Sequence, residues 1–192
     1  MSPSLSEFTV LRHAIAVRGT VRMALLPVTV IGWTVAVTVV LLHLEGTASG
    51  ALPALVSLSV LVGGFEAIHA LNVGVERIGR YLQVYYEGEV DGPTWETTAM
   101  AAGPGLPGGG IDPLFTVVFA ALTGLNLALA FPHLRTMTDY AVILPVHAIF
   151  WIRLIRARGA AARQRAVDLE TFRAVKSGQD QTKSQVSGSG RG

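Results

Sequence analysis

Residues 52–75 read LPALVSLSVLVGGFEAIHALNVGV, an apolar run in which Glu66 is the only Asp, Glu, Lys or Arg. A helix rises about 1.5 Å per residue, so this run is long enough to cross the roughly 30 Å of hydrocarbon in a bilayer. Three further apolar runs lie at 23–44, 114–131 and 140–156. The sequence therefore predicts an all-α, polytopic integral membrane protein with four transmembrane helices in a bundle.

The composition agrees with an apolar surrounding. Of 192 residues, 51% are hydrophobic and only 15% are charged. The chain has no cysteine, so disulfides and thiolate metal sites are excluded. The small excess of basic residues does not indicate binding to nucleic acid, because these residues gather at the ends of the apolar runs. We therefore expect the lipid bilayer, and not nucleic acid, as a partner.

The basic residues also predict an orientation. The predicted transmembrane domain is 23–156. Of the 15 Lys and Arg residues, all except Arg135 lie at or toward the same side of the membrane. Because cytoplasmic loops carry the excess of Lys and Arg, we expect residues 1–22, the loop 88–112 and both termini in the cytoplasm. The predicted location is the plasma (cytoplasmic) membrane, or cell inner membrane.

Three segments lie outside the predicted spans. Helix-forming residues continue past the second span to Glu87, so the second helix is expected to extend into the cytosol. Residues 88–112 are rich in Gly and Pro and predict a loop. Residues 157–176 predict a basic amphipathic helix, and residues 177–192 a disordered tail.

Polar residues follow one face of the second helix. At about 100° per residue, its polar side chains fall within an arc of roughly 140°. They are Glu66, His69, Asn72, Glu76, Arg77, Arg80, Gln83 and Glu87. A charged side chain in the middle of a bilayer costs about 2.5 to 3.5 kcal/mol on insertion scales, so we expect Glu66 to face protein or water, to be paired, or to be protonated.

Depth suggests the partner of Glu66. Glu66 lies about 21 Å below the outer surface, and Arg153 of the fourth span lies about 20 Å below it. We therefore predict an ion pair that fixes the register of these helices. A second pair, Glu76 with Arg80, is expected at i,i+4 spacing.

His147 lies nearer to the outer surface, at about 10 Å. It is close in depth to Asn126 and Thr38, so a hydrogen bond between helices is expected there. The predicted polar network within the membrane consists of Glu66, His69, Asn72, Glu76, Arg80, Asn126 and Arg153.

A cofactor site is an alternative interpretation. Glu66-x-x-His69 has the i,i+3 spacing by which carboxylate bundles direct two ligands to a metal, although a second such motif is missing. His69 or His147 is a candidate axial ligand of a haem or chlorophyll, but their depths, about 25 Å and 10 Å, argue against one shared iron. An enzyme centred on Glu66 and His69 belongs to the same class.

Two further functions stay open. A buried carboxylate near a histidine is also typical of proton-coupled transport, for which four spans are few. Basic residues after the fourth span are candidates for binding lipid headgroups. These are Arg156, Arg158, Arg163 and Arg165.

We expect a non-enzymatic packing or binding component, either a homo-oligomer or an accessory subunit of a larger membrane complex. The buried polar groups are able to satisfy one another, and they do not form a complete catalytic set. Small residues at Ala120, Gly124 and Ala128 form a ridge that suits close helix contact, either between copies or within one chain.

Overall fold

The computed structural model describes residues 5–43, 51–87, 94–102 and 113–189, and every regular element in this part of the chain is helical. The elements are α1 (Leu5–His43), α2 (Ala51–Tyr85), α3 (Trp95–Ala102), α4 (Pro113–Ala130), the 3₁₀ turn η1 (Phe131–His133) and α5 (Met137–Ser189). Four of them, α1, α2, α4 and α5, are long and apolar enough to cross a membrane. The all-α class and the four apolar helices are thus as predicted.

Two helices are longer than the spans predicted within them. α1 already begins at Leu5, so residues 5–22 continue the helix of the first span. α5 runs without a break through the predicted fourth span and amphipathic helix. It also includes residues 177–189, which were predicted to be disordered; this prediction is corrected. No proline follows Pro145, and the Gln and Lys residues of this segment are good helix formers.

The described part of the segment 88–112 is residues 94–102, which contain the short helix α3. The rest of this segment, 88–93 and 103–112, lies outside the described residues, as do residues 190–192 of the predicted tail. The predicted extension of the second helix is present, since α2 continues to Tyr85.

A capping box explains where α5 begins. The Asp139 carboxylate accepts hydrogen bonds from the backbone N–H groups of Arg135 and Thr136, both at 2.9 Å. In return, the Thr136 hydroxyl accepts one from the N–H of Asp139 at 3.2 Å. These bonds satisfy donors that have no partner within the helix, and so the first helical residue is Met137.

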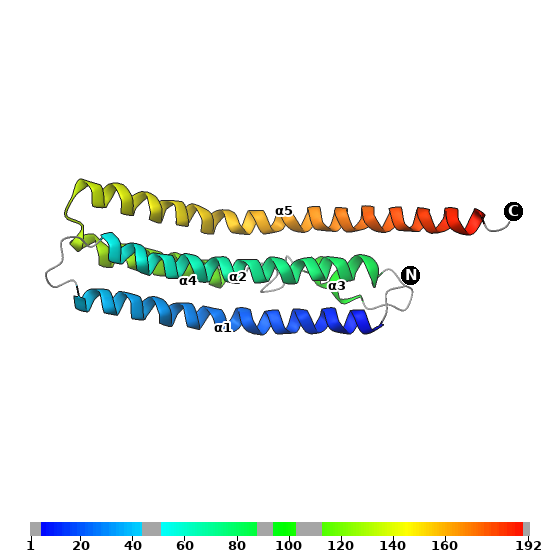
Figure 1. Ribbon diagram of the computed structural model, residues 1–192, viewed down its shortest axis with the longest axis horizontal. Helices are drawn as coiled ribbons and strands as arrows, with labels where there is room; N and C mark the ends of the chain where they lie inside the picture. The colour runs from blue at the N-terminus through cyan, green and yellow to red at the C-terminus, as the bar shows by residue number, and fades with distance from the viewer. Residues whose placement is uncertain (1–4, 44–50, 88–93, 103–112, 190–192) are drawn as a thin grey trace.

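Figure 1 shows α2 between α1 and α5, and α2 also contacts α4. The chain enters α1 and leaves α5 at the same end of the molecule, where α5 projects beyond the other helices (Figure 1). Phe65 of α2 lies at the centre of the core. Its ring packs edge-on against the rings of Phe119 and Phe150, with 5.5 and 5.8 Å between ring centroids. The core cluster draws on all four long helices: Trp33, Leu58, Leu61, Phe65, Ile68, Phe115, Phe119, Phe150, Leu154 and Ala157.

Two neighbouring glycines of α2 have different surroundings. A Cβ on Gly64 would overlap Oγ1 and Cγ2 of Thr29, so the backbone of α2 lies directly against α1 at this point. A Cβ on Gly63 would meet nothing within 4 Å. Gly64 therefore brings α1 and α2 together, and Gly63 belongs to a face of α2 that no other described residue covers.

Candidate functional site

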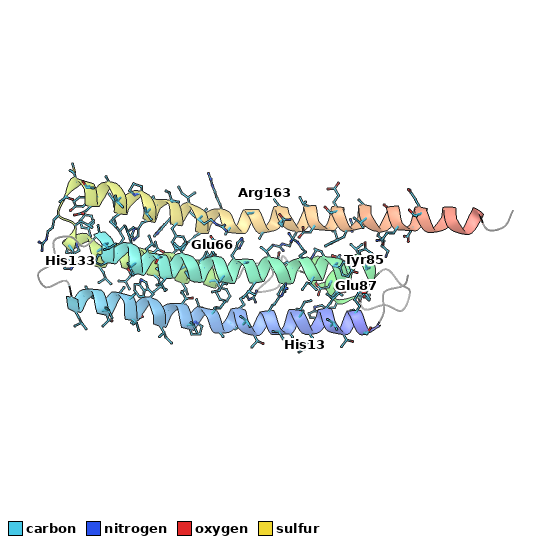
Figure 2. The ribbon with its side chains drawn as sticks, in the orientation of Figure 1. His13, Glu66, Tyr85, Glu87, His133 and Arg163 are labelled. Carbon is cyan, nitrogen blue, oxygen red and sulfur yellow. The ribbon has the colours of Figure 1, made fainter. Side chains whose placement is uncertain are left out.

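Glu66 on α2 and Arg153 on α5 form the ion pair that their depths predicted. Arg153 Nε lies 2.8 Å from Glu66 Oε1, and Arg153 Nη2 donates to Glu66 Oε2 at 2.8 Å. Such two-point contacts combine charge with fixed geometry. Glu66 lies on the side of α2 that faces α5 (Figure 2). The side chains are 43% and 36% exposed, so the pair lies at the surface of the molecule, within the apolar segment of α2.

His69 lies beside this pair. Its ring stacks on Phe65 with 5.9 Å between centroids and 4° between planes, and Arg153 lies 5.7 Å from the same Phe65 ring. The Nδ1 atom of His69 is buried without a hydrogen-bond partner among the described residues. Within that part of the chain, no three His, Cys, Asp or Glu side chains gather as a metal site would require. The predicted haem, chlorophyll or metal role of His69 therefore stays a prediction.

Asn126 joins all four long helices. Its side-chain oxygen accepts hydrogen bonds from Trp33 Nε1 at 3.1 Å and from the Ser57 hydroxyl at 2.5 Å. Its Nδ2 donates to the carbonyl of Ala54 at 3.1 Å and to Nε2 of His147 at 3.1 Å. The four bonds use the full hydrogen-bonding capacity of the amide.

His147 completes this cluster. Its Nδ1 lies 2.8 Å from the carbonyl of Ile143, so Nδ1 carries the proton and Nε2 accepts from Asn126. The expected hydrogen bond between His147 and Asn126 is confirmed, whereas Thr38 is exposed on α1. His69 and His147 have different partners, and Nε2 of His147 is engaged by Asn126.

Trp33 and Ser57 were not identified from the sequence as members of this cluster. The position of Trp33 was an available signal, because tryptophan in membrane proteins usually lies at the interface. A tryptophan near the middle of an apolar run needs an acceptor for its N–H group.

A second set of polar residues follows Asn72 along α2. Asn72 accepts a hydrogen bond from Arg22 Nη1 at 2.5 Å and donates to Glu76 at 3.1 Å. Glu76 also lies 3.2 Å from Arg165 of α5. The predicted pairing of Glu76 with Arg80 stays a prediction. The structure brings Glu76 to Arg165 and brings Arg80 within 3.9 Å of Glu96 on α3.

Glu96 attaches α3 to the long helices. It lies 3.5 Å from Arg12 of α1, and its side chain is only 15% exposed. Burial raises the pKa of Glu96 above its usual value, and the charges of Arg80 and Arg12 oppose this shift. Glu87 accepts hydrogen bonds from the backbone N–H groups of Glu96 and Thr97, at 2.5 and 2.6 Å, at the start of α3.

The residues predicted to bind lipid headgroups have different surroundings in the structure. Arg156 and Arg163 are exposed on α5, and no carboxylate of the described part contacts them. Arg165 is engaged by Glu76, which lowers its suitability as a headgroup ligand. Arg158 belongs to α5, but its side chain lies outside the described part of the structure.

The predicted ridge on α4 packs partly within the chain. A Cβ on Gly124 would lie 3.7 Å from the ring of Trp151 on α5, and Ala120 packs against the core cluster. Ala128 is exposed.

Comparison with protein-family models, curated proteins and solved structures finds no match to this chain.

Proposed function

We propose that the protein is an integral membrane protein that crosses the bilayer four times, with both termini in the cytoplasm, and acts as a packing component by associating with a second copy of itself. Four helices of sufficient length and apolarity support the insertion. The gathering of all Lys and Arg residues except Arg135 on one side supports the orientation. The plasma membrane is the proposed location.

The half-exposed pair of Glu66 and Arg153 is the observation that carries this proposal. Charged groups within a bilayer almost always face protein or a water-filled cavity, because lipid offers them no compensating contact. Glu66 and Arg153 satisfy each other, but more than a third of each side chain is left uncovered by the chain itself. A protein surface placed over the pair removes the remaining contact with lipid.

The face of α2 beside the pair suits close contact with another helix. Its exposed residues within the span are Leu52, Val56, Ser59, Gly63, Ala67 and Ala70, and the four nearest the pair along the helix are small. Small residues allow helix backbones to approach closely in membranes. In this chain the small-residue face adjoins a charged pair, which gives an association both its fit and its polar contact.

The geometry of the pair favours a second copy as the partner. Glu66 and Arg153 lie at the same predicted depth, so the direction from one to the other runs in the plane of the membrane. A two-fold axis along the membrane normal reverses every direction in that plane. Such an axis beside the pair directs Glu66 of each copy toward Arg153 of the other, so the charges are complementary without any other protein.

Energy transfer between donor- and acceptor-labelled copies in vesicles of neutral lipid tests the proposal. We expect transfer that rises with the ratio of protein to lipid. Ala67→Leu adds bulk to the exposed face without touching the charges and should weaken association at least tenfold. Ala121→Leu makes the same change at an exposed position of α4 and should have no effect. Absence of transfer in the wild type, or equal transfer in both variants, contradicts the proposal.

The cofactor interpretation is the second candidate, and one observation favours it. The Nδ1 atom of His69 has no hydrogen-bond partner among the described residues, and the carboxylate of Glu66 lies one helical turn away. A metal ion would use Glu66 and His69 as ligands, and a haem or chlorophyll would use His69 as an axial ligand. Visible absorbance and metal analysis of the purified protein test this candidate. A stoichiometric signal that is lost in His69→Ala supports it, and a signal retained in that variant excludes His69 as a ligand.

A further inference from the structure

Arg18 of α1 lies against the backbone of α2. A Cβ on Gly74 would come within 2.7 Å of Arg18 Nη1 and 3.7 Å of its Cζ, so the guanidinium occupies the space that a side chain at position 74 would need. Arg18 is otherwise exposed. Glycine at position 74 thus allows a surface arginine to lie flat on the neighbouring helix, with part of its charged end open to the surroundings.

Arg22 lies one helical turn further along α1, on the same face. Its Nη1 donates to Asn72 at 2.5 Å, and its Cζ lies 5.8 Å from the ring of Phe115 at the start of α4. Its Nε is buried and has no hydrogen-bond partner among the described residues. A buried, unpaired guanidinium N–H costs free energy and is a donor available to a ligand.

Arg18 and Arg22 differ from the other arginines around α2 in their partners within the described part of the chain. Arg77, Arg153 and Arg165 each contact a carboxylate, as do Arg12 and Arg80, which share Glu96. Among the described residues, no carboxylate contacts Arg18 or Arg22. The acid nearest along α2, Glu76, is engaged by Arg165 and by the amide of Asn72. The described residues thus leave these two positive charges without a carboxylate.

Their position matches the level of lipid headgroups. The first span is predicted to begin at residue 23 and the second to end at residue 75, so Arg18, Arg22 and Gly74 lie where the helices leave the hydrocarbon. Guanidinium groups bind phosphate oxygens through paired, charge-assisted hydrogen bonds.

We propose that Arg18 and Arg22, next to Gly74, bind the phosphate of an anionic phospholipid headgroup in the cytoplasmic leaflet. The proposal rests on the membrane insertion and orientation given above, and it is independent of self-association. Anionic lipids are attracted to basic residues at this level of a membrane, and the position of the Arg18 guanidinium against Gly74 adds a defined place to this general attraction.

Native mass spectrometry of the protein in a neutral detergent tests this site. We expect phosphatidylglycerol to be retained and phosphatidylcholine to be lost under the same conditions. Arg18→Gln combined with Arg22→Gln should lower the retention of phosphatidylglycerol at least fivefold. Arg173→Gln removes a charge from an exposed position far along α5 and should leave retention unchanged. Equal retention of the two lipids, or equal loss in Arg173→Gln, overturns the proposal.

Gly74→Leu tests the position of the Arg18 guanidinium without changing the charge of the site. The variant keeps both arginines but fills the place of the Arg18 guanidinium, so it should also lose phosphatidylglycerol. Its thermal unfolding in neutral detergent shows whether the fold is kept, and a folded variant with unchanged retention contradicts the site. Inorganic phosphate is the second arm of the test. Displacement of the lipid by millimolar phosphate would assign the site to a free anion and overturn the lipid assignment.

Discussion

Glu66 on α2 and Arg153 on α5 are separated by 87 residues in sequence and joined by two contacts of 2.8 Å. Each residue lies within a helix that is apolar enough to cross a membrane. The pair therefore fixes the register of α2 against α5 and, through its exposed side, supplies the polar contact of the proposed self-association.

The first prediction concerns the coupling within this pair. Glu66→Gln leaves Arg153 charged without its partner, and we expect it to lower the free energy of unfolding by about 1 to 3 kcal/mol, since the pair is only partly buried. Adding Arg153→Gln should restore much of this loss. A double-mutant cycle measured by denaturation in mixed micelles checks the coupling, and strictly additive losses would refute it.

The second prediction concerns the hydrogen bonds of Asn126. Asn126→Leu removes the hydrogen-bond partner of Trp33 Nε1 and of His147 Nε2, so we expect a loss of about 2 to 4 kcal/mol. Ser57 keeps backbone carbonyls of its own helix as acceptors. Trp33→Phe removes one bond and should cost about 1 kcal/mol. Thr34→Val is the control, because the Thr34 hydroxyl is exposed and bonds only within its own helix. Unfolding measurements that rank the three variants alike would contradict the assigned role of Asn126.

The third prediction compares the adjacent glycines of α2. Gly64→Ala forces its new Cβ against Thr29, whose branched side chain has little freedom to move, so we expect a loss of about 1 to 3 kcal/mol. Gly63→Ala meets open space and should be neutral or slightly stabilising, because alanine favours the helix by about 1 kcal/mol. Thermal unfolding in dilute detergent, where the monomer prevails, gives the comparison. Equal effects at the two positions would show that the close contact of α1 and α2 is wrong.

The fourth prediction concerns the dependence of stability on pH. Burial raises the pKa of Glu96 above the ordinary value of 4.5 in the folded state. The folded protein therefore holds this proton more tightly, so the contribution to stability is complete below pH 4.5 and is lost as the pH rises through the raised pKa. We expect the resistance of α3 to proteolysis to fall over this window. Glu96→Gln should remove the step, and the exposed Glu170→Gln should keep it.

The sequence allowed prediction of contacts between residues at equal depth within apolar helices. Residue spacing alone placed Glu66 level with Arg153 and His147 level with Asn126, because a membrane span restricts both the direction and the length of a helix. The contacts of Glu76 and Glu96 were missed. These contacts depend on where α5 and α3 lie against α2 outside the spans. There the membrane does not restrict the direction or the length of a helix.

The length of α5 was also missed. Local composition favoured disorder after residue 176, whereas the observed helix continues to Ser189. Lys176 donates to the carbonyl of Val84 at 2.7 Å and lies 5.7 Å from the ring of Tyr85, so α5 still contacts α2 at the residue where disorder was expected to begin. A contact between segments 92 residues apart cannot be read from the composition of either one.

Cysteine cross-linking at Ala67 is a direct measurement of self-association through the small-residue face of α2. The chain has no native cysteine, so a single Ala67→Cys introduces the only thiol. A two-fold axis beside the pair of Glu66 and Arg153 brings Ala67 close to its own counterpart, and a disulfide requires Cα atoms about 4.4 to 6.8 Å apart. We expect a disulfide-linked dimer in membranes for Ala67→Cys and none for Ala121→Cys on α4. No dimer with Ala67→Cys, or equal cross-linking at both positions, would contradict self-association through this face.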